Sequence, residues 1–341
     1  MKLKLEPGLS MPLYKQLVTQ IQHAVSSGKL LPGQLLPSLN DLSAEAGISK
    51  ETVKKAYGIL MGRGVIGSKQ GKGYYVSDPS VLSKPRVLLV FDKLSIYKQL
   101  LYNSFEDTIG DHAELTILTH NQSVDLLEFY LDNNLDQFDY YVITPHFPLE
   151  AVVQARVNVQ LSRIPNRKLI LLDRLQPGFS GNFGAVYQDF DNDIYHGLMQ
   201  GVGEHTQSHR MRVIILPQSL YGNCIRRGVE RFCQEMGMDV EFYASVPEDI
   251  SVGDTFLVLN SQLDDGIVAL SRRIKALGLS IGQDVRIISY NEFDMNELIL
   301  GGLTTVSADF RQMGRYAAEM ILNRRMDKIH CDFRMTRRST F

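Results

Sequence analysis

The sequence predicts an α/β protein that consists of a small helical module followed by one or two open, doubly wound parallel sheets. At 341 residues the chain exceeds the roughly 150 residues that one domain usually holds. After residue 86, β-prone apolar runs alternate with helical patterns about every 25 residues, which is typical of βα units. The first 80 residues instead combine short amphipathic helical patterns with a glycine-rich hairpin pattern.

The composition, 44% hydrophobic and 22% charged, is that of an ordinary globular protein. No run approaches the roughly 18 uncharged apolar residues of a membrane span, and MKLKLEPGLS lacks the apolar core of a signal peptide. We therefore expect a cytoplasmic protein with no membrane partner. The three cysteines have no CxxC spacing, which favours reduced thiols over disulfides or a zinc site.

Charge is divided unevenly along the chain. Residues 1–80 hold ten basic and five acidic side chains, a net charge of +5, whereas the remaining residues carry −7. A basic module on an acidic body favours binding of a polyanion. Basic side chains that neutralise the phosphates of a polyanion release the counterions condensed on it, which favours binding. A solvated lysine-rich surface is the alternative interpretation.

Three helices are predicted in the basic module. Pro12 suits the first position of the first helix, whose apolar residues Leu13, Leu17, Ile21 and Val25 recur every four residues up to Ser27-Gly28. Ser38 with Asp41 forms a capping-box pattern that opens a second, short helix, which ends at Gly47. Ser49 can cap a third helix with Val53, Ala56, Tyr57 and Leu60 on its buried face.

The turn at residues 46–48 places the second and third helices in the arrangement of a helix-turn-helix, whose second helix enters the major groove of DNA. Val65-Ile66 and Tyr74–Val76 are β-prone runs on either side of a glycine-rich tip with two lysines. Such a tip can approach a phosphate or a minor groove closely. A small helical bundle with an incidental hairpin is the alternative.

From Pro12 to Val76 the sequence resembles the winged helix-turn-helix of GntR-family bacterial transcription regulators. The shared motifs are PLYKQ, SGKLLPGQLLPS, GISKETV and QGKGYYV. The resemblance implies DNA contacts by the third helix and the wing, and Asn40 stands where the family often has arginine, so the operator preference is expected to differ. The residues expected to contact double-stranded DNA are Ser38, Asn40, Ser49, Lys50, Glu51, Thr52, Lys54, Lys69, Gln70, Gly71 and Lys72.

We therefore predict a DNA-binding domain at 1–77, a linker rich in proline and serine at 78–85 and a large domain at 86–341. Strands of the large domain are predicted at 87–91, 115–118, 140–144, 169–172, 185–187, 213–216, 240–243, 256–259 and 285–289. Helices are predicted near 96–109, 123–134, 191–207, 222–236, 263–278 and 310–323. Most of these strands lack strict alternation, which indicates buried parallel strands.

Motifs of catalysis are not found in the large domain. The sequence has no GxxxxGK[ST], no GxSxG, and no GxGxxG after a strand. His205 and His209 could share a helix face but have no third ligand nearby, so a solvated helix end is favoured over a metal site. No cofactor and no metal are expected, and binding is favoured over catalysis.

Residues 285–323 resemble the carboxy-terminal signature of LacI/GalR-type sugar-sensing domains, which have the two-lobed periplasmic-binding-protein fold of type I. The segments that carry this resemblance are VRIISYNEFD, LTTV and MGRYAAEMIL. The resemblance implies a sugar site between the lobes, with Asp173 as hydroxyl-binding carboxylate, Tyr187 as aromatic platform and Asn291 in place of an aspartate. The family's arginine position, three residues before a helix glycine, holds Ile225, so we choose its neighbour Arg226. The effector-binding residues expected are Phe91, Asp92, Tyr97, His146, Asp173, Tyr187, Asp189, Arg226, Asn260 and Asn291.

Together the two resemblances imply a homodimeric, non-enzymatic transcription regulator of carbohydrate-utilisation genes. Its heads would bind a palindromic operator, and its effector would be a pentose or deoxyhexose such as arabinose or fucose. One alternative is an enzyme acting on a sugar or sugar phosphate that carries a GntR-like head. Another is a body that binds a protein partner or has a constitutive architectural role.

Overall fold

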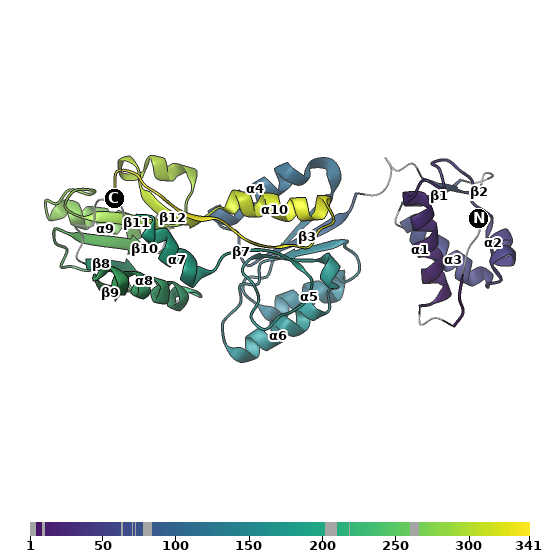
Figure 1. Cartoon of the computed structure of the whole chain (residues 1–341), viewed down its shortest axis with the longest axis horizontal. Helices are drawn as coiled ribbons and strands as arrows, with labels where there is room; N and C mark the ends of the chain where they lie inside the picture. The colour runs from purple at the N-terminus through teal and green to yellow at the C-terminus, as the bar shows by residue number, and fades with distance from the viewer. Residues whose placement is uncertain are drawn as a thin grey trace. The chain divides into compact units, whose positions relative to one another are not determined.

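The computed structural model describes residues 5–8, 11–62, 64–69, 71, 73–77, 84–201, 210–217, 219–259 and 266–341. These residues form two compact units, Met1–Lys84 and Pro85–Phe341. The first unit is helical with a small hairpin, and the second contains two six-stranded sheets with helices (Figure 1). The predicted α/β class, with a winged helix-turn-helix and doubly wound parallel sheets, is confirmed.

The first unit contains the three predicted helices and the predicted hairpin. Its elements are α1 (Leu13–Ser26), α2 (Leu39–Ala46), α3 (Lys50–Gly62), β1 (Ile66–Lys69) and β2 (Gly73–Val76). Gly47 ends α2 in the left-handed conformation (φ 65°), which glycine adopts without steric cost, and the chain then turns directly into α3. The hydroxyl of Tyr57 donates a hydrogen bond of 3.0 Å to the carbonyl of Pro37, which ties α3 to the start of α2.

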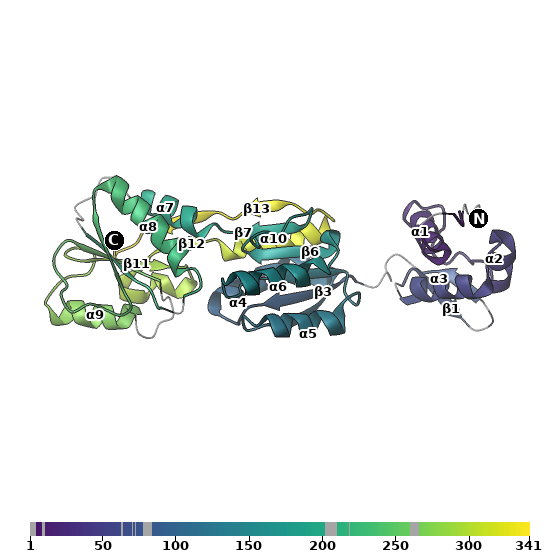
Figure 2. The ribbon, with the colours of Figure 1, turned by 90° about the horizontal axis from the view of Figure 1, so that it is seen from below.

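The second unit has two lobes. In lobe 1 the parallel sheet has the order β13-β7-β6-β5-β3-β4, with α4 and α10 on one face and α5 and α6 on the other. Figures 1 and 2 show these helix pairs. Its elements are β3 (Arg86–Phe91), α4 (Ile96–Ile109), β4 (Glu114–Thr119), α5 (Val124–Asn134), β5 (Tyr140–Ile143), α6 (Ala151–Ser162), β6 (Leu169–Asp173), β7 (Gly184–Tyr187), α10 (Phe310–Leu322) and β13 (Lys328–His330).

Lobe 2 repeats this plan with the order β14-β12-β11-β10-β8-β9, in which β14 alone runs antiparallel to its neighbour. Helices α7 and α8 pack on one face of its sheet and α9 on the other. Its elements are α7 (Phe190–Met199), β8 (Arg210–Ile214), α8 (Gly222–Met236), β9 (Asp239–Tyr243), β10 (Asp254–Val258), α9 (Gly266–Ala276), β11 (Arg286–Tyr290), β12 (Thr304–Ala308) and β14 (Phe333–Thr336).

The chain passes between the lobes three times. The first crossover joins β7 to α7, the second joins β12 to α10, and the third joins β13 to β14. Because each lobe is completed by segments from distant parts of the sequence, neither lobe is a continuous stretch of chain. We refer to these three crossovers together as the hinge.

The structure corrects several predicted elements. Helix α6 was not predicted, since its exposed valines, among them Val152 and Val159, break the helical periodicity of apolar residues. Strands β12, β13 and β14 were also missed. The predicted helix at 191–207 ends at Met199, and residues 202–209, which include His205 and His209, lie outside the described residues. Strand β8 begins three residues earlier than predicted because the buried Arg212 interrupts its apolar pattern.

Other expectations concern cysteines, metals and membranes. All three cysteines are free thiols, and Cys233 and Cys331 are buried. Within the described part of the chain, no helix is long and apolar enough to cross a membrane, and no cluster of three or more metal-ligating side chains occurs.

A buried charge network stabilises the amino-terminal edge of the lobe 2 sheet. Arg212 is fully buried and donates hydrogen bonds of 2.7 Å to the carbonyl and to the carboxylate of Asp249. Its guanidinium also lies 3.4 Å from Asp254, which accepts a 2.8 Å bond from Arg210. Asp254 is buried like Arg212, whereas the Asp249 side chain is 73% exposed. Loss of Arg212 would therefore leave one buried carboxylate, which Arg210 still pairs, and one carbonyl without its donor.

We predict that Arg212→Met lowers the free energy of unfolding by about 1–3 kcal/mol in urea denaturation, because buried acceptors lose their donor. The matched control is Arg315→Met, because Arg315 forms an exposed ion pair with Glu319 that is worth at most about 1 kcal/mol. Equal losses in the two variants would contradict this account of lobe 2.

Candidate functional site

The exposed side of α3 presents the predicted DNA-contact residues. Ser49 caps the helix by accepting a 3.1 Å hydrogen bond from the backbone N–H of Thr52, and the two hydroxyls lie 2.8 Å apart. Lys50, Glu51 and Lys54 are exposed, and Lys54 lies 3.8 Å from Glu51. Lys50 and Lys54 are thus exposed cations beside the capped start of α3, where they can reach a phosphate or a base.

Helix α2 and the wing add the remaining candidates. Ser38 accepts a hydrogen bond from the N–H of Asp41 and caps α2 as predicted, and Asn40 is exposed in the first turn. Lys69 is exposed at the end of β1, and Gly71 adopts φ 80° at the tip. Gln70 and Lys72 lie outside the described residues.

A cavity of about 490 Å³ lies between the two lobes of the second unit. It is lined by residues that follow the carboxyl ends of strands in both sheets, the position where open α/β sheets bind ligands. Lobe 1 contributes Asp92, Lys98, His146 and Asp173, and lobe 2 contributes Tyr221, Tyr290 and Asn291.

Four charged or titratable side chains meet on the lobe 1 side of the cavity. Lys98, from the first turn of α4, donates a hydrogen bond to Asp173 at the end of β6 and lies 3.4 Å from Asp92, which follows β3. Nε2 of His146 lies 3.0 Å from Asp173, although the angle is not that of a hydrogen bond. Each of these side chains is at least nine-tenths buried.

The ion pairs keep these groups charged. Burial by itself would raise the pKa of Asp173, but the charges of Lys98 and His146 outweigh it and hold that pKa far below its usual range. The same balance lowers the pKa of Asp92. Burial would lower the pKa of Lys98, but the two carboxylates raise it. Asp92, Lys98 and Asp173 are therefore ionised throughout the physiological pH range.

A neutral histidine, His120, is linked to this cluster through Thr144. Burial lowers the pKa of His120 to about 4, so its ring is uncharged at neutral pH. Nδ1 accepts a 3.1 Å hydrogen bond from the N–H of Gln122, so Nε2 carries the proton and donates it to the carbonyl of Thr144. The hydroxyl of Thr144 in turn accepts a 2.8 Å bond from the N–H of Asp92.

Aromatic side chains form further walls of the cavity. Phe190 and Tyr221 stack with ring centroids 4.2 Å apart, and Tyr97 stacks on Phe310 at 5.4 Å. Stacked rings offer flat apolar faces beside the polar groups. This combination suits a ligand that has both an apolar face and polar edges.

Three uncharged polar atoms of the cavity residues are buried and have no hydrogen-bond partner within the described residues. They are Oε1 of Gln188, the hydroxyl of Tyr290 and Oδ1 of Asn291. An unsatisfied buried polar atom costs about 1–3 kcal/mol, so a bound ligand that satisfies it regains that free energy. Asp173 and Asn291 also have positive φ values of 70° and 77°, a strained conformation that often marks ligand sites.

Five of the predicted effector residues line the cavity: Asp92, Tyr97, His146, Asp173 and Asn291. Asn260 lies outside the described residues. The carboxylate of Asp173 is already engaged by Lys98 and by the amide of Gln188, so its main contacts are within the protein.

Phe91, Tyr187, Asp189 and Arg226 are not among the residues that line this cavity. Phe91 points into the core beneath α4, and the Tyr187 ring packs against His330. Asp189 accepts a hydrogen bond from Asn192 in the first turn of α7. Arg226 lies 3.8 Å above the ring of Phe242, whereas Ile225, at the family's spacing, lines the cavity.

Sequence reasoning missed Lys98, Gln188, Tyr221 and Tyr290. A signal for Lys98 was present, because it shares the buried face of α4 with Leu101, Phe105 and Ile109. When a lysine stands where the helical periodicity expects a buried apolar residue, it indicates a buried partner of opposite charge. Gln188, Tyr221 and Tyr290 carry no comparable signal, since polar and aromatic residues at strand ends are common.

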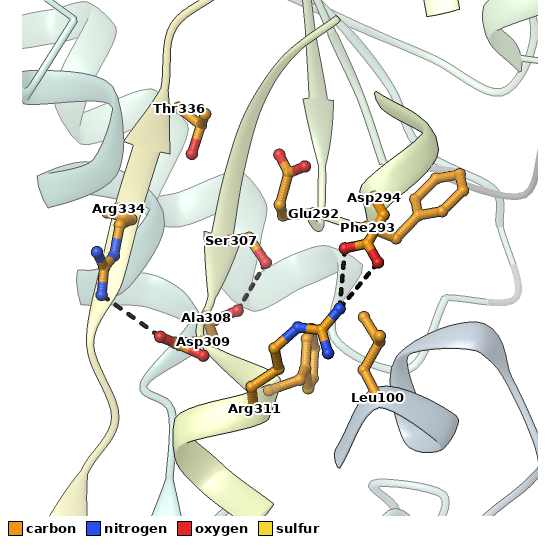
Figure 3. A pocket seen from close by; sticks show the side chains of 11 residues that line it. Leu100, Glu292, Phe293, Asp294, Ser307, Ala308, Asp309, Arg311, Arg334 and Thr336 are labelled. Atoms are coloured by element: carbon orange, nitrogen blue, oxygen red, sulfur yellow. Dashed lines mark hydrogen bonds and ion pairs between the residues drawn. The ribbon is translucent and has the colours of Figure 1, made fainter. Parts of the chain in front are cut away.

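A second, smaller cavity of about 210 Å³ lies where the second crossover enters α10. Figure 3 shows Arg311 of lobe 1 directed toward Asp294 of lobe 2, with distances of 2.9 and 3.0 Å to its two oxygens. Arg334 lies 3.4 Å from Asp309 in the same view. Phe310 lines both cavities, so the two are separated by the aromatic residues at the hinge.

Comparison with known proteins identifies both parts of the chain. Residues 13–76 match the bacterial regulatory proteins of the gntR family, and residues 205–331 match a periplasmic binding protein-like domain. The HTH-type transcriptional repressor YtrA of Bacillus subtilis is 30% identical over 99 residues, which are 29% of this chain and 72% of YtrA. The chain belongs to the GntR family. The chain spans less than half the length of the next five curated relatives it matches.

Solved structures resemble this GntR-family chain over most of its length. A dimeric Lac repressor has a TM-score of 0.58 at 16% identity, covering 75% of this chain and 98% of that one. The trehalose repressor of Escherichia coli has a TM-score of 0.56 at 14% identity, covering 74% and 100%. At these identities the likeness establishes the fold, which is the two-lobed periplasmic-binding-protein fold that the sequence predicted.

We predict that Lys98→Met lowers the free energy of unfolding by about 3–5 kcal/mol at pH 7, because two buried carboxylates lose their counter-charge. In the wild type their depressed pKa values stabilise the fold above about pH 4, and this stabilisation is lost as pH falls through the folded pKa values. In the variant, burial is no longer offset by Lys98, so it raises the pKa values of Asp92 and Asp173. The folded protein then binds protons at these carboxylates more tightly than the unfolded chain does. The deficit relative to the wild type therefore shrinks as pH falls from 7 toward 5.

Urea denaturation at several pH values measures this deficit. Lys93→Met, at an exposed lysine of the same cavity, is the control and should stay close to the wild type at every pH. A deficit that is constant or grows on acidification would show that Lys98 does not hold the carboxylates ionised.

Proposed function

We propose that this chain is a bacterial transcription regulator that binds double-stranded DNA through its winged head and a small neutral sugar through its two-lobed body. The observation that carries the proposal is the inter-lobe cavity in a chain with a GntR-family head. The cavity has stacked aromatic rings and uncharged polar atoms that have no partner among the described residues. The regulator acts on chromosomal DNA in the cytoplasm.

A neutral sugar fits the chemistry of the cavity. Sugar hydroxyls can satisfy the free oxygens of Gln188 and Asn291, and the apolar face of a sugar ring can stack on the aromatic walls. The buried cation Lys98 is already paired with two carboxylates, so a buried phosphate would lack a counter-charge there. We propose a pentose or deoxyhexose such as arabinose or fucose as the effector.

Control of DNA binding follows from closure of the lobes. We propose a homodimer on a palindromic operator, as the dimeric Lac repressor that shares the fold suggests. Closure over the sugar changes the geometry of the dimer and thereby the spacing of the two recognition helices. A coupling free energy of about 1–3 kcal/mol would change operator affinity about 5- to 150-fold.

A panel of L-arabinose, L-fucose, trehalose, glucose and their phosphates tests the effector site by thermal denaturation. At 100 times its Kd a neutral sugar should add about 2.7 kcal/mol, which raises the melting temperature by about 5–10 °C. Recovery of the sugar unchanged after incubation distinguishes the sensor from an enzyme. No shift with any member contradicts the sugar-sensor proposal, and conversion of the sugar supports the alternative of an enzyme with a DNA-binding head.

Lys54→Ala tests the recognition helix. If Lys54 contacts a phosphate, affinity for operator and random DNA falls alike, and the slope of log affinity against log salt decreases by about 1. Lys55→Ala is the control, because the Lys55 ammonium lies 4.1 Å above the ring of Tyr14 on the side of α3 that faces α1. Equal DNA affinity of Lys54→Ala and the wild type would exclude this face from the interface.

A further inference from the structure

Gln188 lies on the first crossover between the lobes of the second unit. It is the residue between Tyr187, where β7 of lobe 1 ends, and the start of lobe 2 at Asp189 and α7. Its side chain is 95% buried and lines the cavity between the lobes. Gln188 therefore belongs both to the candidate effector site and to the first crossover of the hinge.

The orientation of the Gln188 amide is fixed by its neighbour. Asp173 stays ionised because Lys98 and His146 outweigh the effect of burial on its pKa, and an ionised carboxylate can only accept hydrogen bonds. The nitrogen of the amide must therefore face Asp173, to which it donates a hydrogen bond. This leaves Oε1 of Gln188 directed away from Asp173.

Oε1 of Gln188 is buried and has no partner among the residues that the structure describes. Because the nitrogen is held by Asp173, rotation of the amide cannot relieve this unsatisfied acceptor. A ligand that donates a hydrogen bond to Oε1 would relieve it. The matching group on a neutral polyol is a hydroxyl.

The backbone connects this contact to the hinge. The N–H of Gln188 donates a hydrogen bond of 3.4 Å to the carbonyl of Asp173, so main chain and side chain of Gln188 are both held by one residue. Asp173 itself has φ 70°, a conformation that is unfavourable for a non-glycine residue and persists only where its surroundings enforce it. Lys98 and Asp173 thus act as positioning residues for Gln188.

Lobe 2 offers two complementary groups across the cavity. The hydroxyl of Tyr290 and Oδ1 of Asn291 are also buried and unpartnered within the described chain. A ligand bound to Gln188 and to these groups would join the first crossover to the carboxyl end of β11. Its binding would favour one arrangement of the lobes.

We infer that Gln188 is a specificity-determining residue that accepts a hydrogen bond from one hydroxyl of a neutral polyol and couples that hydroxyl to the first crossover. The inference rests on the proposed function and assigns to it a residue and a hydrogen-bond direction. The ligand must donate at this position, so an analogue that lacks that hydroxyl loses the contact.

Titration calorimetry of the full chain with L-arabinose and L-fucose, and with their single-deoxy analogues, tests the inference. Gln188→Met should weaken binding of the parent sugar about 3- to 30-fold, the effect of losing one buried hydrogen bond and leaving its donor unpaired. The deoxy analogue that lacks the hydroxyl bound by Gln188 should bind the wild type weakly. Its affinity should not fall further in the Gln188→Met variant. A purely structural role of Gln188 would not select one hydroxyl position.

Gln176→Met is the matched control. Gln176 is equally buried, and its nitrogen donates one hydrogen bond. Its buried oxygen has no partner among the described residues, but Gln176 does not line the cavity. We expect the sugar affinity of Gln176→Met to stay within about twofold of the wild type, a smaller change than the loss of one hydrogen bond to the sugar would cause. If Gln188→Met does not fold, Gln188→Asn replaces it in the same cycle, because it keeps the amide but shortens its reach.

The outcomes separate the two proposals. Failure of the wild type to bind any sugar of this series or of the larger panel contradicts the proposed function, and the inference falls with it. Binding by the wild type that is unchanged in the Gln188 variant, or weakened equally for every deoxy analogue, overturns the inference and leaves the proposed function standing.

Discussion

The buried ion pair between Lys98 and Asp173 is the constraint on which the cavity depends. It joins α4 to the end of β6, and Lys98 also pairs with Asp92 after β3, the strand on the other side of β5. Two carboxylates in this apolar setting could not both stay ionised without the lysine. Because Asp173 stays ionised, the Gln188 amide has a single orientation. The polarity that the cavity presents to a ligand is therefore set by a charge pair that need not touch the ligand.

Some of the side-chain contacts between the lobes are individually weak. Outside the three crossovers, the ion pair between Arg311 and Asp294 is more than half exposed on both sides, and such pairs contribute about 1 kcal/mol or less. The rings of Tyr97 and Phe310 in lobe 1 meet Phe293 of lobe 2 between the two cavities. A ligand that makes a few hydrogen bonds to both lobes supplies free energy on the same scale, so its binding can select one lobe arrangement.

Local signals account for what the sequence revealed. The capping serines Ser38 and Ser49 and the apolar runs of the parallel strands identified the head and most of both sheets, because these features are local. Helix α6 and strand β8 were harder, since exposed valines and the buried Arg212 contradict the usual periodicity. The strand-end residues Asp92, Asp173 and Asn291, which the family resemblance assigned to the effector site, line the cavity between the lobes. The partners of Asp173 could not be predicted, because Lys98 and Gln188 reach it from distant elements.

The central claim is that the body transmits sugar binding to the head. Its most direct test is the affinity of the full chain for an operator, selected from a random-sequence DNA pool, with and without a saturating sugar that binds the body. The account predicts a change of about 5- to 150-fold in operator Kd at constant salt. An operator affinity that is the same with the sugar bound as without it would contradict the account.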